Sequence, residues 1–215
     1  MSLEVNEIEV KKILTEIKEA KLIAATKYVS IAEIEKLEEL GVKYFGENRV
    51  QAFLDKYEKY QGNCDFHLIG TLQANKVKYI IDKVSMIHSV DSYSLIKEIE
   101  KQASKHNLIM DVLIQVNIAK EESKHGFEVE EIEEVFNTLK DYKHINVCGL
   151  MMMAPNINPE ETREYFKQTK ELFEKLKVAY PEYPLTELSM GMSNDYQIAL
   201  EYGATMIRIG SALFK

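Results

Sequence analysis

Short apolar runs alternate with amphipathic stretches along the whole chain. The runs are rich in leucine and β-branched residues, a composition typical of strands buried on both faces of a parallel sheet. We expect strands at residues 22–27, 43–46, 65–69, 84–88, 109–117, 145–151, 185–190 and 205–209.

The stretches between these runs carry helical spacing and helix-start signals. Ser30 and Glu33 form a capping box ahead of an apolar stripe, and Gly41 suits the end of that helix. Residues 158–161 read Asn-Pro-Glu-Glu, which combines a cap, a proline at the first helical position and acids near the positive end of the helix dipole. A further helix is predicted near residues 5–20, ahead of the first strand.

Eight strands, each followed by a helix or a helix-like turn, predict an α/β protein built as a single (β/α)8 TIM barrel with an extra N-terminal helix. A doubly wound sheet is the alternative, because βα alternation fits both folds, but the strand count favours the barrel. The chain stops six residues after the last predicted strand. We therefore expect one domain spanning residues 1–215.

Composition narrows the class of protein. The net charge is −8, which argues against a general binder of nucleic acid. The first ten residues form no secretory signal, and no run approaches the roughly 20 apolar residues of a membrane helix. Cys64 and Cys148 are isolated and the five histidines form no ligand motif. We expect a cytoplasmic protein with no membrane partner and no metal site.

Lys27 closes the first apolar run and is followed at once by a helix start. A lysine at the end of a buried strand lies at the rim of a core. A desolvated amine there is what Schiff-base chemistry with an aldehyde requires. An ordinary edge lysine would occupy the same place, so this pattern leaves both interpretations open.

In a barrel the strand ends open on one face, where active sites lie. Lys27, Asn48, Ser193 and Arg208 follow or end different predicted strands and could converge there. Phosphate sites in barrels often use the loops after strands seven and eight.

Those two loops contain candidate phosphate ligands. Ser193 or Asn194 is expected to cap a helix at 194–202, with free amides facing an anion. Gly210 allows close backbone approach, and Ser211 adds a hydroxyl and an amide. The alternative is that Ser193 is only a helix cap and Gly210 only a turn.

Several separated segments together carry a family resemblance. They are Ala25-Thr26-Lys27, Phe45 to Asn48, His67 to Lys76, Gly149 to Met151, Leu188 to Ser193 and Arg208 to Phe214. They resemble the pyridoxal-phosphate homeostasis family, which is similar in fold to the N-terminal barrel of alanine racemase. The segments occur in the family's order and cover nearly the whole chain.

The resemblance implies that pyridoxal 5′-phosphate is the cofactor and that Lys27 holds it as a Schiff base. It also implies further cofactor-binding positions, which are Asn48 beside the ring, Ser193, Gly210 and Ser211 at the phosphate, Ser189 as an additional contributor, and Arg208 facing the pyridine nitrogen. A cation there disfavours protonation of the ring nitrogen and weakens the ring as an electron sink.

The resemblance further implies a carrier and regulator of the cofactor pool rather than a racemase. We expect a monomer that supplies the cofactor to apo-enzymes, without amino-acid turnover and with no catalytic residue. A pyridoxal-phosphate-dependent racemase or decarboxylase with Lys27 as base is the alternative. A third hypothesis is a cofactor-free barrel enzyme in which Lys27 attacks the carbonyl of a phosphorylated metabolite. His67 is expected to be a core-edge histidine.

Overall fold

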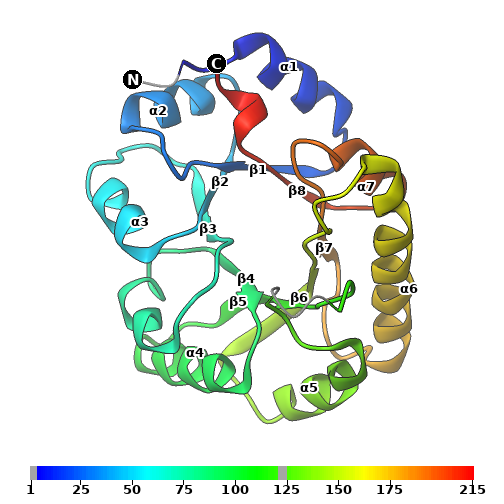
Figure 1. Cartoon of the computed structure of the whole chain (residues 1–215). Helices are drawn as coiled ribbons and strands as arrows, with labels where there is room; N and C mark the ends of the chain where they lie inside the picture. Colours follow the sequence, from blue (N-terminus) through cyan, green and yellow to red (C-terminus); the bar gives the residue numbers. More distant parts are fainter. Residues whose placement is uncertain (1–3, 121–124) are drawn as a thin grey trace.

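Eight parallel strands close into a barrel in which each strand pairs with the next and β8 returns to β1 (Figure 1). The computed structural model describes residues 4–120 and 125–215. The predicted barrel is confirmed. Its strands are β1 (Lys21–Ala25), β2 (Tyr44–Glu47), β3 (Asp65–Leu68), β4 (Met86–Val90), β5 (Met110–Gln115), β6 (Ile145–Met151), β7 (Glu187–Ser189) and β8 (Met206–Ile209).

Helices surround this barrel, and α1 is the extra helix that precedes the first strand (Figure 1). No helix within the described ranges is long and apolar enough to cross a membrane. The α-helices are α1 (Glu7–Glu16), α2 (Ile31–Glu39), α3 (Val50–Tyr57), α4 (Tyr93–Lys105), α5 (Ile132–Leu139), α6 (Arg163–Ala179) and α7 (Tyr196–Glu201), and the 3-10 helices are η1 (Ala74–Tyr79), η2 (Val129–Glu131), η3 (Pro159–Thr162) and η4 (Ser211–Leu213).

The first strand is shorter than predicted. It ends at Ala25, and the chain turns at once, because the Val29 amide donates a hydrogen bond to the Thr26 carbonyl oxygen at 3.3 Å. Lys27 therefore lies in the turn that follows the strand rather than at the strand's last position. Lys27 thus lies on the face of the barrel where the strands end, beside the residues that follow β2 and β8.

The barrel encloses its own core, separate from the larger core between the strands and the helices. Seven buried apolar side chains fill it, and they come from five of the strands, with two from β6, and from the residue that follows β3. They are Ile23, Ile69, Met86, Leu113, Cys148, Met151 and Met206. Inward-facing residues alternate with outward-facing ones along each strand. The barrel is therefore closed by packed side chains and is no open channel.

Gly149 lies where β6 runs close beside β7. Its φ is +158°, and a Cβ built on it would lie 1.7 Å from the carbonyl oxygen of Glu187. Gly149 also directly pairs with Glu187 in the parallel register. A side chain here would force the two strands apart where their hydrogen bonds hold the barrel closed.

We expect Gly149→Ala to lower the free energy of unfolding by about 3 kcal/mol, because the new methyl group meets backbone rather than a movable side chain. Urea denaturation followed by circular dichroism measures this. Gly210→Ala is the matched control, because its Cβ would meet the nearest atom at 3.4 Å. Equal effects of the two substitutions would contradict the close approach of β6 and β7.

Candidate functional site

A cavity of about 620 Å³ opens at the carboxyl-terminal ends of the strands. Five of the predicted cofactor positions line it, and they come from the ends of β2 and β8 and from the loop after β7. These five are Asn48, Ser193, Arg208, Gly210 and Ser211. The structure thus brings together residues that are separated by up to 163 positions in the chain. Its volume falls in the range of small-molecule sites.

Lys27 lines a second cavity, of about 410 Å³, which adjoins the first. The two cavities share Ala25, Asn48, Gly210 and Ser211 as lining residues. The Lys27 ammonium lies 4.6 Å from the centroid of the Tyr28 ring, and its hydrogen bond to the Tyr28 phenol lowers the pKa of that phenol. Lys27 is half-buried. Its amine therefore stands at the border of the larger cavity.

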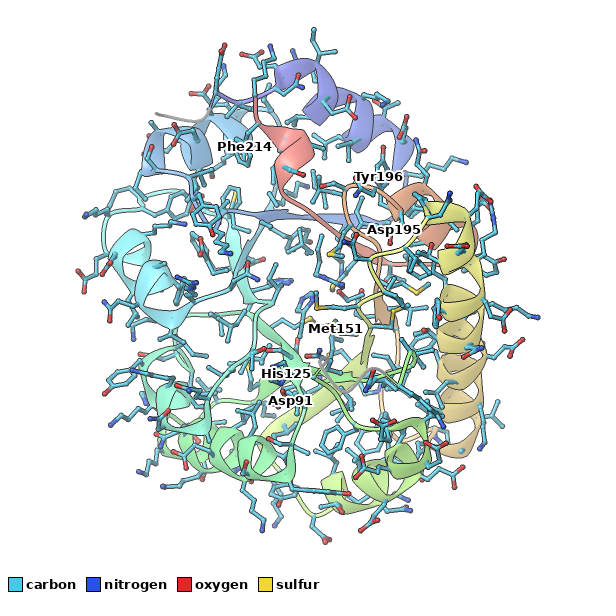
Figure 2. The ribbon with its side chains drawn as sticks, viewed as in Figure 1. Asp91, His125, Met151, Asp195, Tyr196 and Phe214 are labelled. Atoms are coloured by element: carbon cyan, nitrogen blue, oxygen red, sulfur yellow. The ribbon has the colours of Figure 1, made fainter. Side chains whose placement is uncertain are left out.

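The loop between β7 and α7 is held by Asp195 (Figure 2). The Asp195 carboxylate accepts a hydrogen bond from the Met192 amide at 2.6 Å, and the Tyr196 amide donates to the Met192 carbonyl oxygen at 2.9 Å. The residue at the helix cap position is Asp195, so the prediction that Ser193 or Asn194 caps this helix is wrong. The tight turn at Met192 delays the helix, which begins at Tyr196.

This turn leaves donors available at the mouth of the cavity. Within residues 4–120 and 125–215, the amides of Ser193, Asn194 and Ser211 have no acceptor. The Ser211 hydroxyl donates to the Ser193 hydroxyl at 3.3 Å, so the loops after β7 and β8 meet here. Free amides and hydroxyls from two loops are the groups that bind a phosphate in a barrel.

Arg208 provides a buried cation at the floor of the cavity. It is 6% exposed, and its Nη1 donates to the Ser189 hydroxyl at 2.6 Å while Nη2 donates to the Met152 carbonyl oxygen at 2.8 Å. Burial lowers the pKa of Arg208 to about 10, and the Asp195 carboxylate opposes this shift. The guanidinium is therefore charged at neutral pH, although its hydrogen-bond partners are neutral.

Ser189, the remaining predicted position, does not line the cavity. It is fully buried under Arg208, where its hydroxyl accepts the arginine's hydrogen bond. Its contact is thus with the side chain that faces the cavity. We interpret Ser189 as a residue that positions Arg208.

Two histidines continue this chain of hydrogen bonds across the barrel. His88 Nδ1 lies 3.0 Å from the Ser189 hydroxyl, and His88 Nε2 lies 2.9 Å from His67 Nδ1. Burial lowers the pKa of His67 to about 4 and that of His88 well below its usual value, so both rings are neutral. His67 thus lies inside the barrel rather than at the edge of its core.

Sequence reasoning missed the role of His88. The available signal was the two-residue period of a strand, because His88 lies two residues after Met86 on β4 and both face the barrel interior. This period places His88 inside the barrel but does not identify its hydrogen-bond partners. These depend on how β4 lies relative to β3 and β7 in the closed barrel.

A buried carboxylate supports the turn that carries Lys27. Glu47 is 1% exposed at the end of β2, where it accepts hydrogen bonds from the Thr26 hydroxyl and, at 2.7 Å, from the Lys56 ammonium. Lys56 also donates to the Thr26 carbonyl oxygen. Strands β1 and β2 and helix α3 are joined at one point beneath Lys27. The sequence offered one signal, which is that a carboxylate in an apolar run needs a buried partner.

The comparisons with known proteins agree with this geometry. The family model described as the alanine racemase N-terminal domain matches residues 4–215. A pyridoxal phosphate homeostasis protein of Aquifex aeolicus is 46% identical over 197 residues, covering 91% of this chain and 86% of the relative. Its counterpart in Escherichia coli is 32% identical and covers 91% of this chain and 85% of the relative.

Solved structures give the same result. PipY of Synechococcus elongatus without pyridoxal phosphate has a TM-score of 0.93 at 30% identity, covering 97% of this chain and 99% of PipY. PipY with pyridoxal phosphate bound has a TM-score of 0.87. Alanine racemase of Corynebacterium glutamicum, at 15% identity and a TM-score of 0.78, shares the fold.

The barrel and the cavity at its strand ends define the chain as an alanine-racemase-type barrel with a small-molecule site. It belongs to the alanine racemase N-terminal domain family and, within that family, to the pyridoxal phosphate homeostasis proteins.

The neutral His67 ring makes stability depend on pH. The pKa of His67 is about 4 in the folded chain and near 6.5 in the unfolded chain, so the unfolded state binds more protons as the pH falls below 6.5. The stabilisation is therefore complete above pH 6.5 and is lost as the pH falls toward 4. We expect His67→Gln to reduce the fall in the free energy of unfolding between pH 7 and 5.5 by about 1 kcal/mol. Urea titrations at both pH values measure this, and an unchanged difference would contradict a neutral His67.

Proposed function

We propose that this chain binds pyridoxal 5′-phosphate at the carboxyl face of its barrel and acts in homeostasis of that cofactor. One observation carries the proposal. A cavity of about 620 Å³ combines a buried cation at its floor with free amides and hydroxyls at its mouth, and it borders a lysine amine. Relatives named as pyridoxal phosphate homeostasis proteins, and the PipY structure with the cofactor bound, support the same ligand.

The residues present fit the phosphate group. Ser193, Gly210 and Ser211 would hold it through hydroxyls and backbone amides, which suit a dianion. Gly210 faces Ala25, and the absence of a side chain keeps the backbone accessible at this point. Asn48 would line the ring, because it borders both cavities.

The residues also fit the aldehyde and the ring. Lys27 would hold the aldehyde carbon as a Schiff base, and the bound group supplies that electrophilic carbon. Arg208, with Ser189 holding its guanidinium, would face the pyridine nitrogen. A fixed cation at that atom keeps the nitrogen unprotonated, which makes the ring a poor electron sink. This arrangement suits storage of the cofactor more than chemistry on an amino acid.

We propose on the same basis that residues 1–215 work as a single domain, as a cytoplasmic monomer that hands the cofactor to apo-enzymes without amino-acid turnover. The poor electron sink at Arg208 supports the carrier role. The reduced thiols of Cys64 and Cys148 are consistent with the cytoplasm. Size-exclusion chromatography with light scattering tests the monomer, and a dimer mass would contradict it.

Substitution of Lys27 tests the covalent anchor. We expect the protein with added pyridoxal 5′-phosphate to show an imine absorbance band that borohydride fixes, with the mass increase mapped to Lys27. Lys27→Ala should lose both the band and the label, because Lys27 is the only lysine among the described residues that line this cavity or the one adjoining it. Lys59→Ala, an exposed change outside this cavity, is the control and should retain both.

An imine band that survives in Lys27→Ala, or a label on another lysine, would overturn this assignment. Incubation of the loaded protein with a panel of amino acids tests the absence of turnover. Racemised or decarboxylated product that is lost in Lys27→Ala would establish the alternative of an amino-acid racemase or decarboxylase.

The phosphate assignment makes a separate prediction. Ser211→Ala removes one hydroxyl and leaves the fold unchanged, so we expect it to weaken cofactor binding about tenfold, equivalent to about 1.4 kcal/mol. Fluorescence titration with pyridoxal 5′-phosphate measures the dissociation constant. Pyridoxal, which lacks the phosphate, should bind equally to both proteins. A matching loss of pyridoxal binding would contradict a phosphate contact at Ser211.

A further inference from the structure

A third cavity, of about 540 Å³, lies beside the cofactor cavity and shares Asn48 and Thr71 with it. Its remaining walls come from α3 and η1. They include Arg49, Gln73, Lys76 and Tyr79. The segment from His67 to Lys76 is one of those that resemble the family, and the cofactor cavity is lined by only its middle part, Ile69 to Thr71. Residues from the later part of this segment, Thr71, Gln73 and Lys76, line the third cavity.

Two cations line this cavity and no carboxylate does. This is unusual for a chain with 35 acidic and 27 basic residues. A neighbouring hollow that contains Lys56 and Lys59 also contains Asp55, and another contains Glu38 and Asp65. Positive charge in the third cavity is therefore not balanced from within its own walls.

Neither of these two cations forms an ion pair with a described residue. Counting only the described part of the chain, no carboxylate lies within ion-pair distance of Arg49 or Lys76, nor of Lys78, which lies on η1 outside the cavity lining. The ammonium groups of Lys76 and Lys78 lie 5.7 Å and 4.9 Å from the centroid of the Tyr79 ring. Tyr79 is 44% exposed. An aromatic face with cations beside it is thus presented to the cavity.

The start of α3 adds donors to this wall. Arg49 occupies the cap position of α3, and its side chain has no acceptor atom for the first amides of the helix. The first hydrogen bond within the helix runs from the Phe53 amide to the Arg49 carbonyl oxygen. The amides of Val50 and Gln51 therefore have no partner within the helix. These free amides add to the positive charge of Arg49 and Lys76, and both kinds of group favour an anion.

We propose that this cavity is a second ligand site, which binds the phosphate monoester of a small aromatic molecule. Arg49 and Lys76 bind the phosphate and the Tyr79 ring contacts the organic part. The site stands beside the proposed cofactor site and needs neither Lys27 nor Arg208. A ligand held here would lie next to the mouth of the cofactor cavity, with Asn48 between the two.

Amide-resolved NMR of the full chain tests this, with phenyl phosphate and inorganic phosphate as probes. One sample carries the cofactor fixed by borohydride, which fills the first cavity, and another is Lys27→Ala without cofactor. In both we expect phenyl phosphate to shift the amide resonances of Val50, Gln51 and Lys76, and to bind at least threefold more tightly than inorganic phosphate.

Arg49→Gln and Lys76→Gln should each weaken phenyl phosphate binding at least fivefold, whereas Lys59→Gln should leave it unchanged. Tyr79→Leu should remove the preference for phenyl phosphate. These side chains are exposed, so thermal unfolding should be unaltered. Unmoved resonances, or equal binding by the Arg49 and Lys76 variants, would overturn the site. Equal affinity of the two probes would overturn the organic ligand in favour of free phosphate. If the cofactor does not load, the Lys27→Ala sample without cofactor still provides the test.

Discussion

The burial of the Arg208 guanidinium inside the barrel is the constraint on which the site depends. A cation removed from water is costly unless its donors are satisfied. Here two of them go to neutral acceptors, the Ser189 hydroxyl on β7 and the Met152 carbonyl oxygen after β6. The charge is therefore not cancelled by a bound carboxylate. It remains available to a ligand at the floor of the cavity.

Because one side chain on β8 binds both β7 and the end of β6, the floor of the cavity is tied to three strands. Ser189 can accept from Arg208 only while its own hydrogen-bond geometry is fixed, and His88 does this from β4. His67 in turn fixes His88 from β3. Neutral histidines serve here because a protonated ring would place a second buried cation near Arg208.

The sequence could predict the barrel because short, nearly continuous apolar runs and capped helices are local features. It could also group the strand ends, because parallel strands in a barrel all end on one face. It could not identify the histidine chain, since the distance between His67 and His88 depends on closure and register. The α7 cap was missed for a related reason. Whether Ser193 or Asp195 caps that helix depends on a turn fixed by a hydrogen bond to Met192.

Two lysines lie near the end of β1, and their surroundings differ. Lys56 is 13% exposed in its side chain and donates to Glu47 and to the Thr26 carbonyl oxygen, so these contacts hold its ammonium in place. Lys27 instead contacts the face of the Tyr28 ring. The Lys27 amine can move away from that ring without leaving a buried carboxylate unpaired. A reaction at the Lys56 nitrogen would break these contacts and leave the buried Glu47 carboxylate without its cation. Lys56 instead holds the backbone from which Lys27 extends, and the division of roles follows from where Glu47 is buried.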